Sequence, residues 1–212
     1  ANSLSATCNF EPDTAFQQRL ASGGKVLITQ GFIASDAHGD TVLLGRGGSD
    51  TSGSYFAAKL GARRLEIWTD VPGMFTSNPK SVSNARLLKS LDYDEAQEIA
   101  SSGAKVLHPR ALIPLDGSAI ALHVRSFLHP ERPGTEVSSR QTRAAYPVKA
   151  LATIRGQALV TVAGKGMVGV HGIAARTFVA VDSERLSVST IFQASSESSI
   201  GFTLPEGESE RA

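Results

Sequence analysis

The order of its apolar segments predicts an α/β protein with two domains: a layered domain over residues 1–147 and a smaller module over residues 148–212. Strand-like and helix-like runs alternate from residue 25 to residue 124, which is typical of a layered α/β domain with a largely parallel sheet. Between residues 129 and 147 the composition shifts to Pro, Gly, Ser, Thr and Arg, which indicates an edge hairpin and a linker. The remaining patterns follow the order β-β-α-β-β, which predicts a small sheet covered on one side by a helix.

In the first domain, short apolar runs between glycines and polar turns predict strands at Lys25–Ile33, Thr41–Leu44, Arg64–Trp68 and Ala119–Val124. Helical patterns predict helices at Thr51–Leu60, Tyr93–Ser101 and 109–115. Gly61 and Gly103 fit the ends of the first two helices, because glycine readily adopts the left-handed conformation found there. Pro109 fits the first turn of the third helix, where its missing N–H removes no helical hydrogen bond.

In the second domain, apolar and alternating runs predict strands at Val148–Ile154, Ala158–Val162, Leu186–Phe192 and Ser199–Leu204. A helix is predicted at Val168–Val181, since its apolar residues recur with a helical period and share one face.

Composition excludes several functional classes. Hydrophobic residues make up 41% and charged residues 19%, as in a folded soluble protein. Lys and Arg number 21 against 20 Asp and Glu, with no basic stripe, so we expect neither nucleic-acid nor membrane partners. No apolar run approaches the ~20 residues that span a bilayer, and no secretory leader is visible. The lone Cys8 favours a reducing compartment, and we expect a cytoplasmic protein. A polar start without Met indicates a fragment.

A glycine-rich turn, GRGGSDTS, occupies Gly45–Ser52 between a predicted strand and a predicted helix. Glycines there let backbone N–H groups approach an anion, and the helix N-terminus adds its positive dipole. Arg46 offers a planar fork for a carboxylate or phosphate, and Asp50 could cap the helix or bind an ammonium group. A plain tight turn capped by Ser49 or Asp50 fits the pattern equally well. No Gly-Lys-Ser/Thr follows, so it is not a Walker A loop.

Two further strings follow predicted elements. TDVPGMFTSNPK, at Thr69–Lys80, follows the carboxyl end of a strand, where α/β sheets bind ligands, although alone it reads as a surface turn. GAKVLHPRA, at 103–111, reads alone as a helix end with a solvated lysine. In this order and spacing, the three strings resemble the aspartokinases of the amino-acid-kinase family, and the resemblance runs from about Val26 to Val137.

The resemblance implies the C-terminal half of an amino-acid-kinase fold, a carbamate-kinase-like three-layer α/β/α sandwich, followed by a partial ferredoxin-like ACT module. It implies an aspartate kinase that makes 4-phospho-L-aspartate, the first step of the lysine, threonine and methionine pathway. On this sequence, the implied aspartate ligands are Arg46, Ser49 and Asp50. The implied ATP site comprises Thr69, Asp70, Phe75, Lys80, Lys105 and Val106. Arg46, Asp50 and Lys105 would act in catalysis.

Two of these positions depart from the family pattern, with Phe75 where tyrosine is usual and Lys80 where arginine is usual. Phe75 loses a hydroxyl, and Lys80 keeps the charge without the bidentate fork.

The implied cofactor is ATP, with Mg²⁺ carried by the nucleotide. The β-carboxylate of aspartate is ionised at pH 7 and can attack the γ-phosphate without a general base. We expect no metal site of the protein's own, because the histidines show no ligand spacing: His38, His108, His123, His129 and His171. The family's Lys-Phe-Gly-Gly-Thr-Ser stretch, which cradles the ATP phosphates, is absent, so we expect the chain alone to be inactive.

Gly164–Gly169 spells G-x-G-x-x-G after a predicted strand, the fingerprint of a dinucleotide fold, but only 43 residues follow it. The segment from Gln157 to Pro205 instead resembles the first ACT module of aspartokinases, especially of those fused to homoserine dehydrogenase. That resemblance implies an effector site, for lysine or threonine, with Gly166, Met167 and Gln193. It also implies a homo-oligomer formed through ACT pairing.

Two alternatives remain open. The chain could belong to another kinase of the same family, such as a glutamate or uridylate kinase. It could also be a catalytically silent fragment that only binds ligands or assembles.

Overall fold

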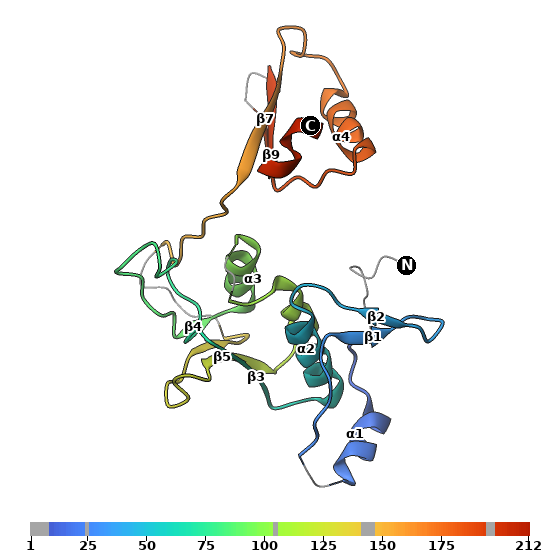
Figure 1. Ribbon diagram of the computed structural model, residues 1–212, viewed down its shortest axis with the longest axis vertical. Helices are drawn as coiled ribbons and strands as arrows, with labels where there is room; N and C mark the ends of the chain where they lie inside the picture. The colour runs from blue at the N-terminus through green and yellow to red at the C-terminus, as the bar shows by residue number, and fades with distance from the viewer. Residues whose placement is uncertain (1–8, 24–25, 104–105, 141–146, 194–197) are drawn as a thin grey trace. The chain divides into compact units, whose positions relative to one another are not determined.

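The computed structural model describes residues 9–23, 26–103, 106–140, 147–193 and 198–212, and the chain divides into two compact units, residues 1–153 and 154–212. Figure 1 shows the elements of each unit. Lys105, one of the implied ATP ligands, lies outside the described residues. Within the described part of the chain, no helix is long and apolar enough to cross a membrane.

A four-stranded mixed sheet forms the centre of the first unit. Its strands follow the order β3 (Arg64–Thr69), β5 (Ala121–Ser126), β6 (Thr135–Val137) and β4 (Ser90–Leu91). The first two strands are parallel over six residue pairs, from Arg64↔Ala121 to Thr69↔Ser126. β6 turns back antiparallel to β5 in a hairpin, and β4 runs parallel to β6 on its other side. The predicted edge hairpin is therefore wrong in its position, because β6 lies inside the sheet.

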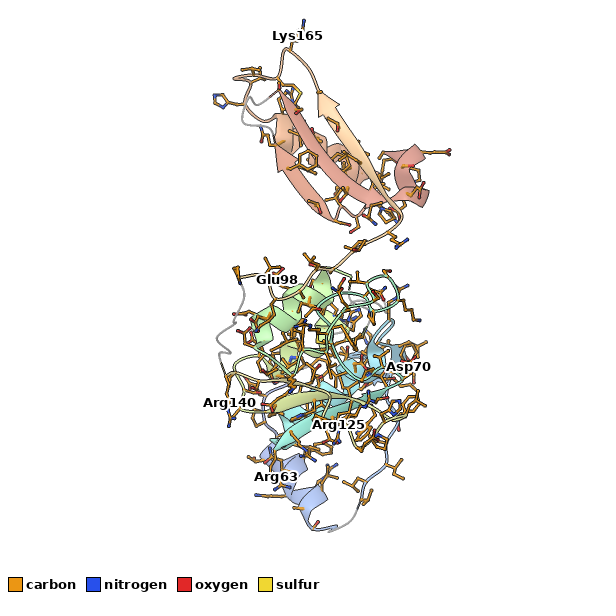
Figure 2. All side chains as sticks on the ribbon, turned by 90° about the vertical axis from the view of Figure 1, so that its left-hand side faces the viewer. Arg63, Asp70, Glu98, Arg125, Arg140 and Lys165 are labelled. Carbon is orange, nitrogen blue, oxygen red and sulfur yellow. The ribbon has the colours of Figure 1, made fainter. Side chains whose placement is uncertain are left out.

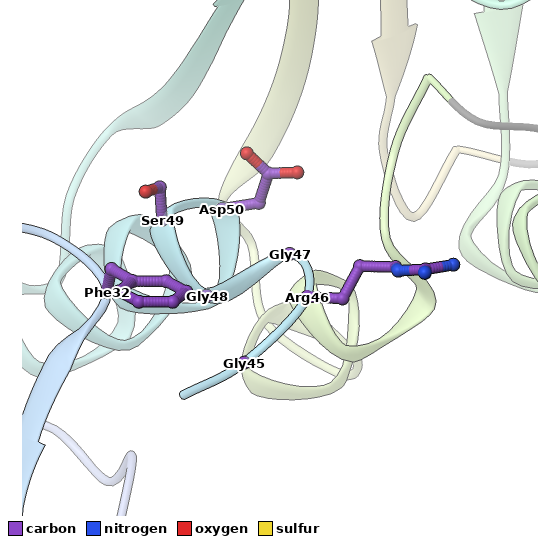
Figure 3. Close-up of a pocket in the computed structure, with 7 residues that line it drawn as sticks. All are labelled: Phe32, Gly45, Arg46, Gly47, Gly48, Ser49 and Asp50. Carbon is purple, nitrogen blue, oxygen red and sulfur yellow. The ribbon is translucent and has the colours of Figure 1, made fainter. Parts of the chain in front are cut away.

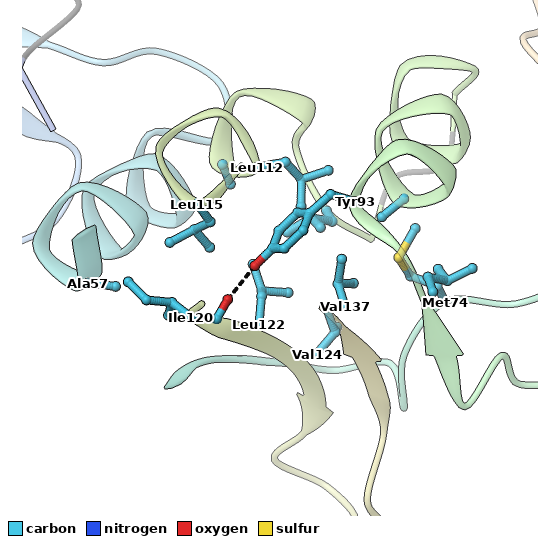
Figure 4. Packing of buried hydrophobic residues seen from close by; sticks show 13 residues of the cluster. Ala57, Met74, Tyr93, Leu112, Leu115, Ile120, Leu122, Val124 and Val137 are labelled. Atoms are coloured by element: carbon cyan, nitrogen blue, oxygen red, sulfur yellow. Dashed lines mark hydrogen bonds between the residues drawn. The ribbon is translucent and has the colours of Figure 1, made fainter. Parts of the chain in front are cut away.

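Helices cover one face of this sheet. They are α2 (Gly48–Leu60), α3 (Tyr93–Ser101) and two 3₁₀ turns, η2 (Pro109–Ala111) and η3 (Ile113–Leu115). Their buried side chains meet those of β5 and β6 in one cluster, drawn in Figure 4, where the Tyr93 hydroxyl donates to the Ile120 carbonyl. The opposite face carries Glu66, Trp68 and Arg125, with the Arg125 guanidinium 4.7 Å from the Trp68 ring. The described residues thus supply the sheet and one helical layer.

Two smaller elements adjoin α2. Helix α1 (Thr14–Ala21) packs against it, and the Gln17 amide donates to the Lys59 carbonyl at 2.8 Å. The antiparallel hairpin of β1 (Ile33–Ser35) and β2 (Thr41–Leu43) leads into the glycine turn, and the Leu44 N–H donates to the Phe32 carbonyl at 2.9 Å.

A buried hydroxyl fastens the long loop between β3 and β4 to the sheet. Thr135 on β6 is fully buried, and its Oγ1 accepts from the Met74 N–H at 2.9 Å and donates to the Leu88 carbonyl at 2.6 Å. Both ends of the 74–88 loop are therefore held by one side chain. A Cβ on Gly73 would lie 2.4 Å from this hydroxyl oxygen, so glycine is required there.

The segment that leaves the first unit lies along that loop. The Leu151 N–H donates to the Thr76 carbonyl at 2.8 Å. The Lys149 ammonium pairs with one oxygen of Glu95, while the other oxygen accepts from the Asp92 N–H in the capping box of α3. One carboxylate thus serves both the helix start and the departing chain.

The second unit is a three-stranded antiparallel sheet with one helix on it. Its order is β7 (Gln157–Ala163), β9 (Ser199–Pro205) and β8 (Thr190–Gln193). Helix α4 (Ile173–Ser183) covers one face, where the Phe178 and Phe202 rings lie 5.8 Å apart. A 3₁₀ segment, η4 (Glu206–Arg211), ends the chain.

Several predicted elements are confirmed. Helix α3 has the predicted bounds, β3 and β7 differ from prediction by one residue or less at each end, and β9 extends one residue further. Gly61 ends α2 in the left-handed conformation, with φ 57°. The helix itself begins three residues earlier than predicted, at Gly48.

Other predictions are wrong. Of the predicted strand at 25–33, the described residues 26–33 form strand only at Ile33. Val26 and Ile28 are 91% and 95% exposed, and no described strand pairs with them. The segment 148–154 forms no strand, so the first of the strands predicted for the second domain is wrong. The segment 109–115 forms two 3₁₀ turns, since Pro114 cannot donate the bond that a continuous helix needs.

Some elements begin later than predicted. β5 begins at Ala121, α4 at Ile173 and β8 at Thr190. Gly169 and Gly172 adopt positive φ angles of 71° and 81°, which keeps the residues before α4 in turns.

Replacing Thr135 with Val should destabilise the first unit. The substitution keeps the shape but leaves the Met74 N–H and the Leu88 carbonyl buried without a partner, at a cost of about 1–3 kcal/mol. Urea unfolding followed by fluorescence of the single Trp68 measures this unit directly.

The exposed Thr41→Val on β2 is the matched control and should shift stability by less than about 0.5 kcal/mol. Equal unfolding midpoints for the two variants would show that the buried hydroxyl does not anchor the loop.

Candidate functional site

The glycine turn owes its shape to two left-handed residues. Gly45 and Gly47 have φ angles of 72° and 69°, a region that side chains with a Cβ rarely adopt. Gly47 is the N-cap of α2, and no side chain caps this helix. The interpretation of Ser49 or Asp50 as the cap is therefore wrong. Neither side chain is used as a cap, so both are left for other roles.

The first turn of α2 is held in place by close packing against the preceding hairpin. A Cβ on Gly48 would lie 2.6 Å from the Phe32 ring, so only glycine lets the hairpin approach the helix here. Within the helix, the Thr51 and Ser52 hydroxyls each donate to the carbonyl four residues earlier at 2.8 Å. Ser52 Oγ also accepts from the Phe32 N–H at 2.9 Å, which fastens the hairpin to α2.

One open cavity of about 630 Å³ gathers the predicted aspartate ligands. It is lined by Phe32 and by every residue of the turn from Gly45 to Asp50. Figure 3 shows the Arg46 guanidinium extending away from the side chains of Ser49 and Asp50. A cationic fork and a carboxylate thus border one hollow from different directions, an arrangement that suits a small zwitterion.

The Asp50 carboxyl has the most informative electrostatics of the cavity. Burial raises its pKa, while a backbone hydrogen bond from His108 and the nearby imidazole oppose that rise. The pKa of His108 is lowered, first by burial, then by Arg110 and Arg46, with Asp50 opposing. Neutral imidazole is therefore favoured in the fold. An ammonium group beside Asp50 would favour its ionised form.

Residues 108–110 pack against the glycine turn. His108 is the N-cap of η2, and its Nδ1 accepts from the Arg110 N–H at 3.2 Å. The Arg110 guanidinium donates to the Leu44 carbonyl, also at 3.2 Å. The sequence predicts no metal-ligand role for His108, because its spacing does not favour one, and it predicts no role for Arg110. No local pattern could reveal their contacts with the turn.

The predicted nucleotide residues lie apart from the cavity lining. Thr69 ends β3, with its hydroxyl 3.1 Å from the Asp70 carboxylate, and Asp70 is exposed (Figure 2). Phe75 pairs with Leu87 across the loop, and Lys80 is exposed. Val106 is half-buried and packs against the core.

The topology nevertheless places the glycine turn and the predicted nucleotide residue Thr69 at the same end of the sheet. Three residues separate α2 from β3, and the two elements pack together, so the helix runs back along the strand. Thirteen helical residues and six strand residues both span about 20 Å. The N-terminus of α2, with the glycine turn, therefore lies near the carboxyl end of β3, where Thr69 is the last residue.

The implied effector residues gather at one end of the second sheet. β7 and β8 both run antiparallel to β9 and hence parallel to each other. The turn after β7, whose tip is Lys165 in Figure 2, therefore shares an end with Gln193, the last and exposed residue of β8. In this turn the Met167 N–H donates to the Gly164 carbonyl at 3.1 Å, and Gly166 is exposed.

The antiparallel sheet of the second unit also excludes the dinucleotide interpretation of Gly164–Gly169, which requires parallel strands.

Among the described residues, no group of three or more His, Cys, Asp or Glu side chains could hold a metal ion.

Known proteins match both units of the chain. The model of the amino acid kinase family matches residues 8–126, and an ACT domain model matches residues 160–212. The bifunctional aspartokinase/homoserine dehydrogenase of Haemophilus influenzae is 42% identical over 188 residues, 89% of this chain and 23% of that protein. The lysine-sensitive aspartokinase 3 of Escherichia coli is 39% identical over 201 residues, 92% of this chain and 44% of that protein. This chain spans less than half of each relative.

Solved structures agree with the sequence matches. Escherichia coli aspartokinase III in complex with aspartate and ADP superposes with a TM-score of 0.75 at 38% identity, covering 91% of this chain and 42% of that one. Its T-state structure with lysine and aspartate gives 0.73 at 38% identity. The fold, the glycine turn and these matches together show that the chain belongs to the amino acid kinase family, as an aspartokinase-like kinase domain followed by an ACT domain.

Proposed function

We propose that this chain is part of an aspartate kinase, which transfers the γ-phosphate of ATP to the β-carboxylate of L-aspartate. The product is 4-phospho-L-aspartate, from which lysine, threonine and methionine are made. The observation that carries the proposal is the cavity of Arg46, Ser49 and Asp50 in a chain 38% identical to an aspartokinase solved with aspartate and ADP. A glutamate or uridylate kinase would have to accept a different substrate in this same cavity.

Each cavity residue has a distinct part in binding aspartate. The Arg46 guanidinium pairs with the α-carboxylate, because its planar fork matches two carboxylate oxygens. The Asp50 carboxylate faces the substrate ammonium, and Ser49 adds a hydroxyl to the same rim. Backbone N–H groups at the start of α2 add positive potential for an anion. Together they orient the β-carboxylate for attack.

The nucleotide belongs on the neighbouring loops. We assign ATP, carrying Mg²⁺, to Thr69, Asp70, Phe75, Lys80, Lys105 and Val106. The attacking β-carboxylate oxygen forms a bond to the γ-phosphorus, the bond from that phosphorus to the bridging oxygen breaks, and ADP departs. No proton has to be removed, since the carboxylate is already ionised at pH 7. The residues of this chain therefore contribute positioning and charge neutralisation.

The second unit is the regulatory part in this proposal. An amino-acid effector, lysine or threonine, would bind at the end of the sheet that holds Gly166, Met167 and Gln193. The turn after β7 and the last residue of β8 lie at the same end of the sheet, which supports this site. The Escherichia coli relative is named lysine-sensitive, and its T-state structure contains lysine.

This unit also offers a surface for self-association. On the face opposite α4, Leu159 is 62% exposed and Phe192 is 48% exposed, and both lie on edge strands. A bare edge next to apolar side chains favours pairing with another copy.

Arg46→Lys should raise the KM for aspartate roughly ten-fold or more, because losing the bidentate pair costs about 2 kcal/mol and each 1.4 kcal/mol is about ten-fold. The KM for ATP should hardly change. Saturation curves for both substrates, measured in a complete enzyme that carries this segment, decide between an aspartate ligand and a phosphate ligand.

The control is Arg63→Lys, at an exposed position beyond the far end of α2, which should change neither constant. A rise in the ATP constant alone would reassign Arg46 to the phosphates. Activity with glutamate but not aspartate would reject the proposed function itself.

Gln193→Ala should weaken feedback inhibition about five-fold or more and leave uninhibited activity intact, since an amide lost from a ligand leaves its groups unpaired at ~1–3 kcal/mol. Inhibition curves with lysine and with threonine measure the effect. Thr190→Ala, at the other end of the same strand, is the control. Unchanged inhibition by both amino acids would remove Gln193 from the effector site.

Leu159→Lys should shift the chain toward monomer in a sedimentation series, because a charge on the open sheet face opposes pairing. Val179→Lys, at an equally exposed position on α4, is the control and should leave the distribution unchanged. A wild-type chain that stays monomeric at every concentration tested would contradict the pairing.

A further inference from the structure

The glycine turn of the aspartate cavity is held by a segment sixty residues away in sequence. A Cβ built on Gly47 would lie 2.3 Å from both Cβ and Cγ of His108, so the imidazole side chain occupies the space that any other residue at 47 would need. The backbone of Gly47 is left-handed, with φ 69°, and no side-chain cap stabilises it from within. The turn therefore keeps its shape against an external surface, which His108 provides.

A second contact fixes the residue that enters the turn. The Arg110 guanidinium donates to the carbonyl of Leu44 at 3.2 Å, and Leu44 is itself buried. The two contacts are linked, because the His108 Nδ1 accepts from the Arg110 N–H at 3.2 Å. Imidazole and guanidinium thus approach the turn from one short 3₁₀ segment.

A third contact reaches the far end of the turn. The backbone of His108 lies near enough to the Asp50 carboxyl to lower the pKa of that group, against the rise that burial causes. The segment 108–110 therefore touches the turn before its first glycine, at its middle and at its last residue. These three points are the ones that determine where Arg46, Ser49 and Asp50 project.

We propose that His108 and Arg110 are positioning residues of the aspartate site, holding the Gly45–Asp50 turn in the conformation that puts its polar side chains around one cavity. The proposal rests on the function proposed above. Neither side chain lines the cavity, so neither is a catalytic residue. Their contribution is preorganisation, which reduces the ordering that aspartate binding would otherwise require.

Three substitutions separate positioning from mere stability. In a complete enzyme carrying this segment, His108→Ala should raise the KM for aspartate about five-fold or more, equivalent to about 1 kcal/mol. The KM for ATP and the thermal midpoint should change little. His108→Asn should restore much of the affinity, because an Asn side chain can still accept the Arg110 N–H at the cap. Arg110→Met should act in the same direction as His108→Ala.

A double-mutant cycle tests the contact itself. Gly47→Ala alone should impair aspartate binding strongly, because its new methyl group meets the His108 side chain. In a His108→Gly background the obstructing atoms are gone, so the same Gly47→Ala should cost clearly less. Strictly additive effects of the two substitutions would show that the residues are not coupled and would overturn the proposal.

The exposed pair His129→Ala and Arg132→Ala, in the turn after β5, gives the matched controls and should change nothing. If His108→Ala fails to fold, the His108→Asn and Arg110→Met variants still report on positioning. Unchanged aspartate constants in folded His108 and Arg110 variants would reject the inference while leaving the function intact. A wild-type enzyme that does not use aspartate would instead reject the function.

Discussion

The parallel pairing of β3 with β5 is the constraint on which the first unit depends. Six consecutive residue pairs fix their register, and the inward-facing Leu65, Ile67, Leu122 and Val124 join them to one core. Parallel pairing places the carboxyl ends of both strands at the same end of the sheet. Because α2 runs antiparallel to β3, the glycine turn lies at that end too. A one-residue slip would turn the core side chains outward and separate the groups that have to meet.

The two loops at this end of the sheet are fastened by different physical means. The glycine turn is held by shape, since bare Cα atoms at Gly47 and Gly48 let the His108 and Phe32 rings pack against the backbone. The 74–88 loop is held by hydrogen bonds, since the buried Thr135 hydroxyl accepts from the Met74 N–H and donates to the Leu88 carbonyl. Both contacts come from residues distant in the chain. The rigid scaffold beneath the two loops thus keeps both of them in place.

How much the sequence predicts depends on how local the cause is. Helix α3 has its predicted bounds because the groups that end it are local. Gly103, used in the prediction, lies just beyond its last residue, and the structure adds a capping box of Asp92 and Glu95 at its start. The strand at 25–33 was predicted wrongly, because an apolar run becomes a strand only beside a partner, and none pairs with Val26 in the described residues. All lining residues of the cavity except Phe32 follow from one contiguous motif, and Phe32 was missed because it comes from the preceding hairpin. The clamp of His108 on Gly47 could not be predicted, since it depends on packing between distant segments.

The way the chain leaves the first unit has a mechanical consequence. Leu151 is bonded to Thr76, and Lys149 is paired with Glu95, so the last residues before position 154 are tied at two points. A pull on the chain from beyond that position is therefore borne by the 74–88 loop and by the cap of α3 before it reaches the sheet. Force would enter this unit through the 74–88 loop, while the glycine turn, which a separate segment contacts, lies outside the path of the load.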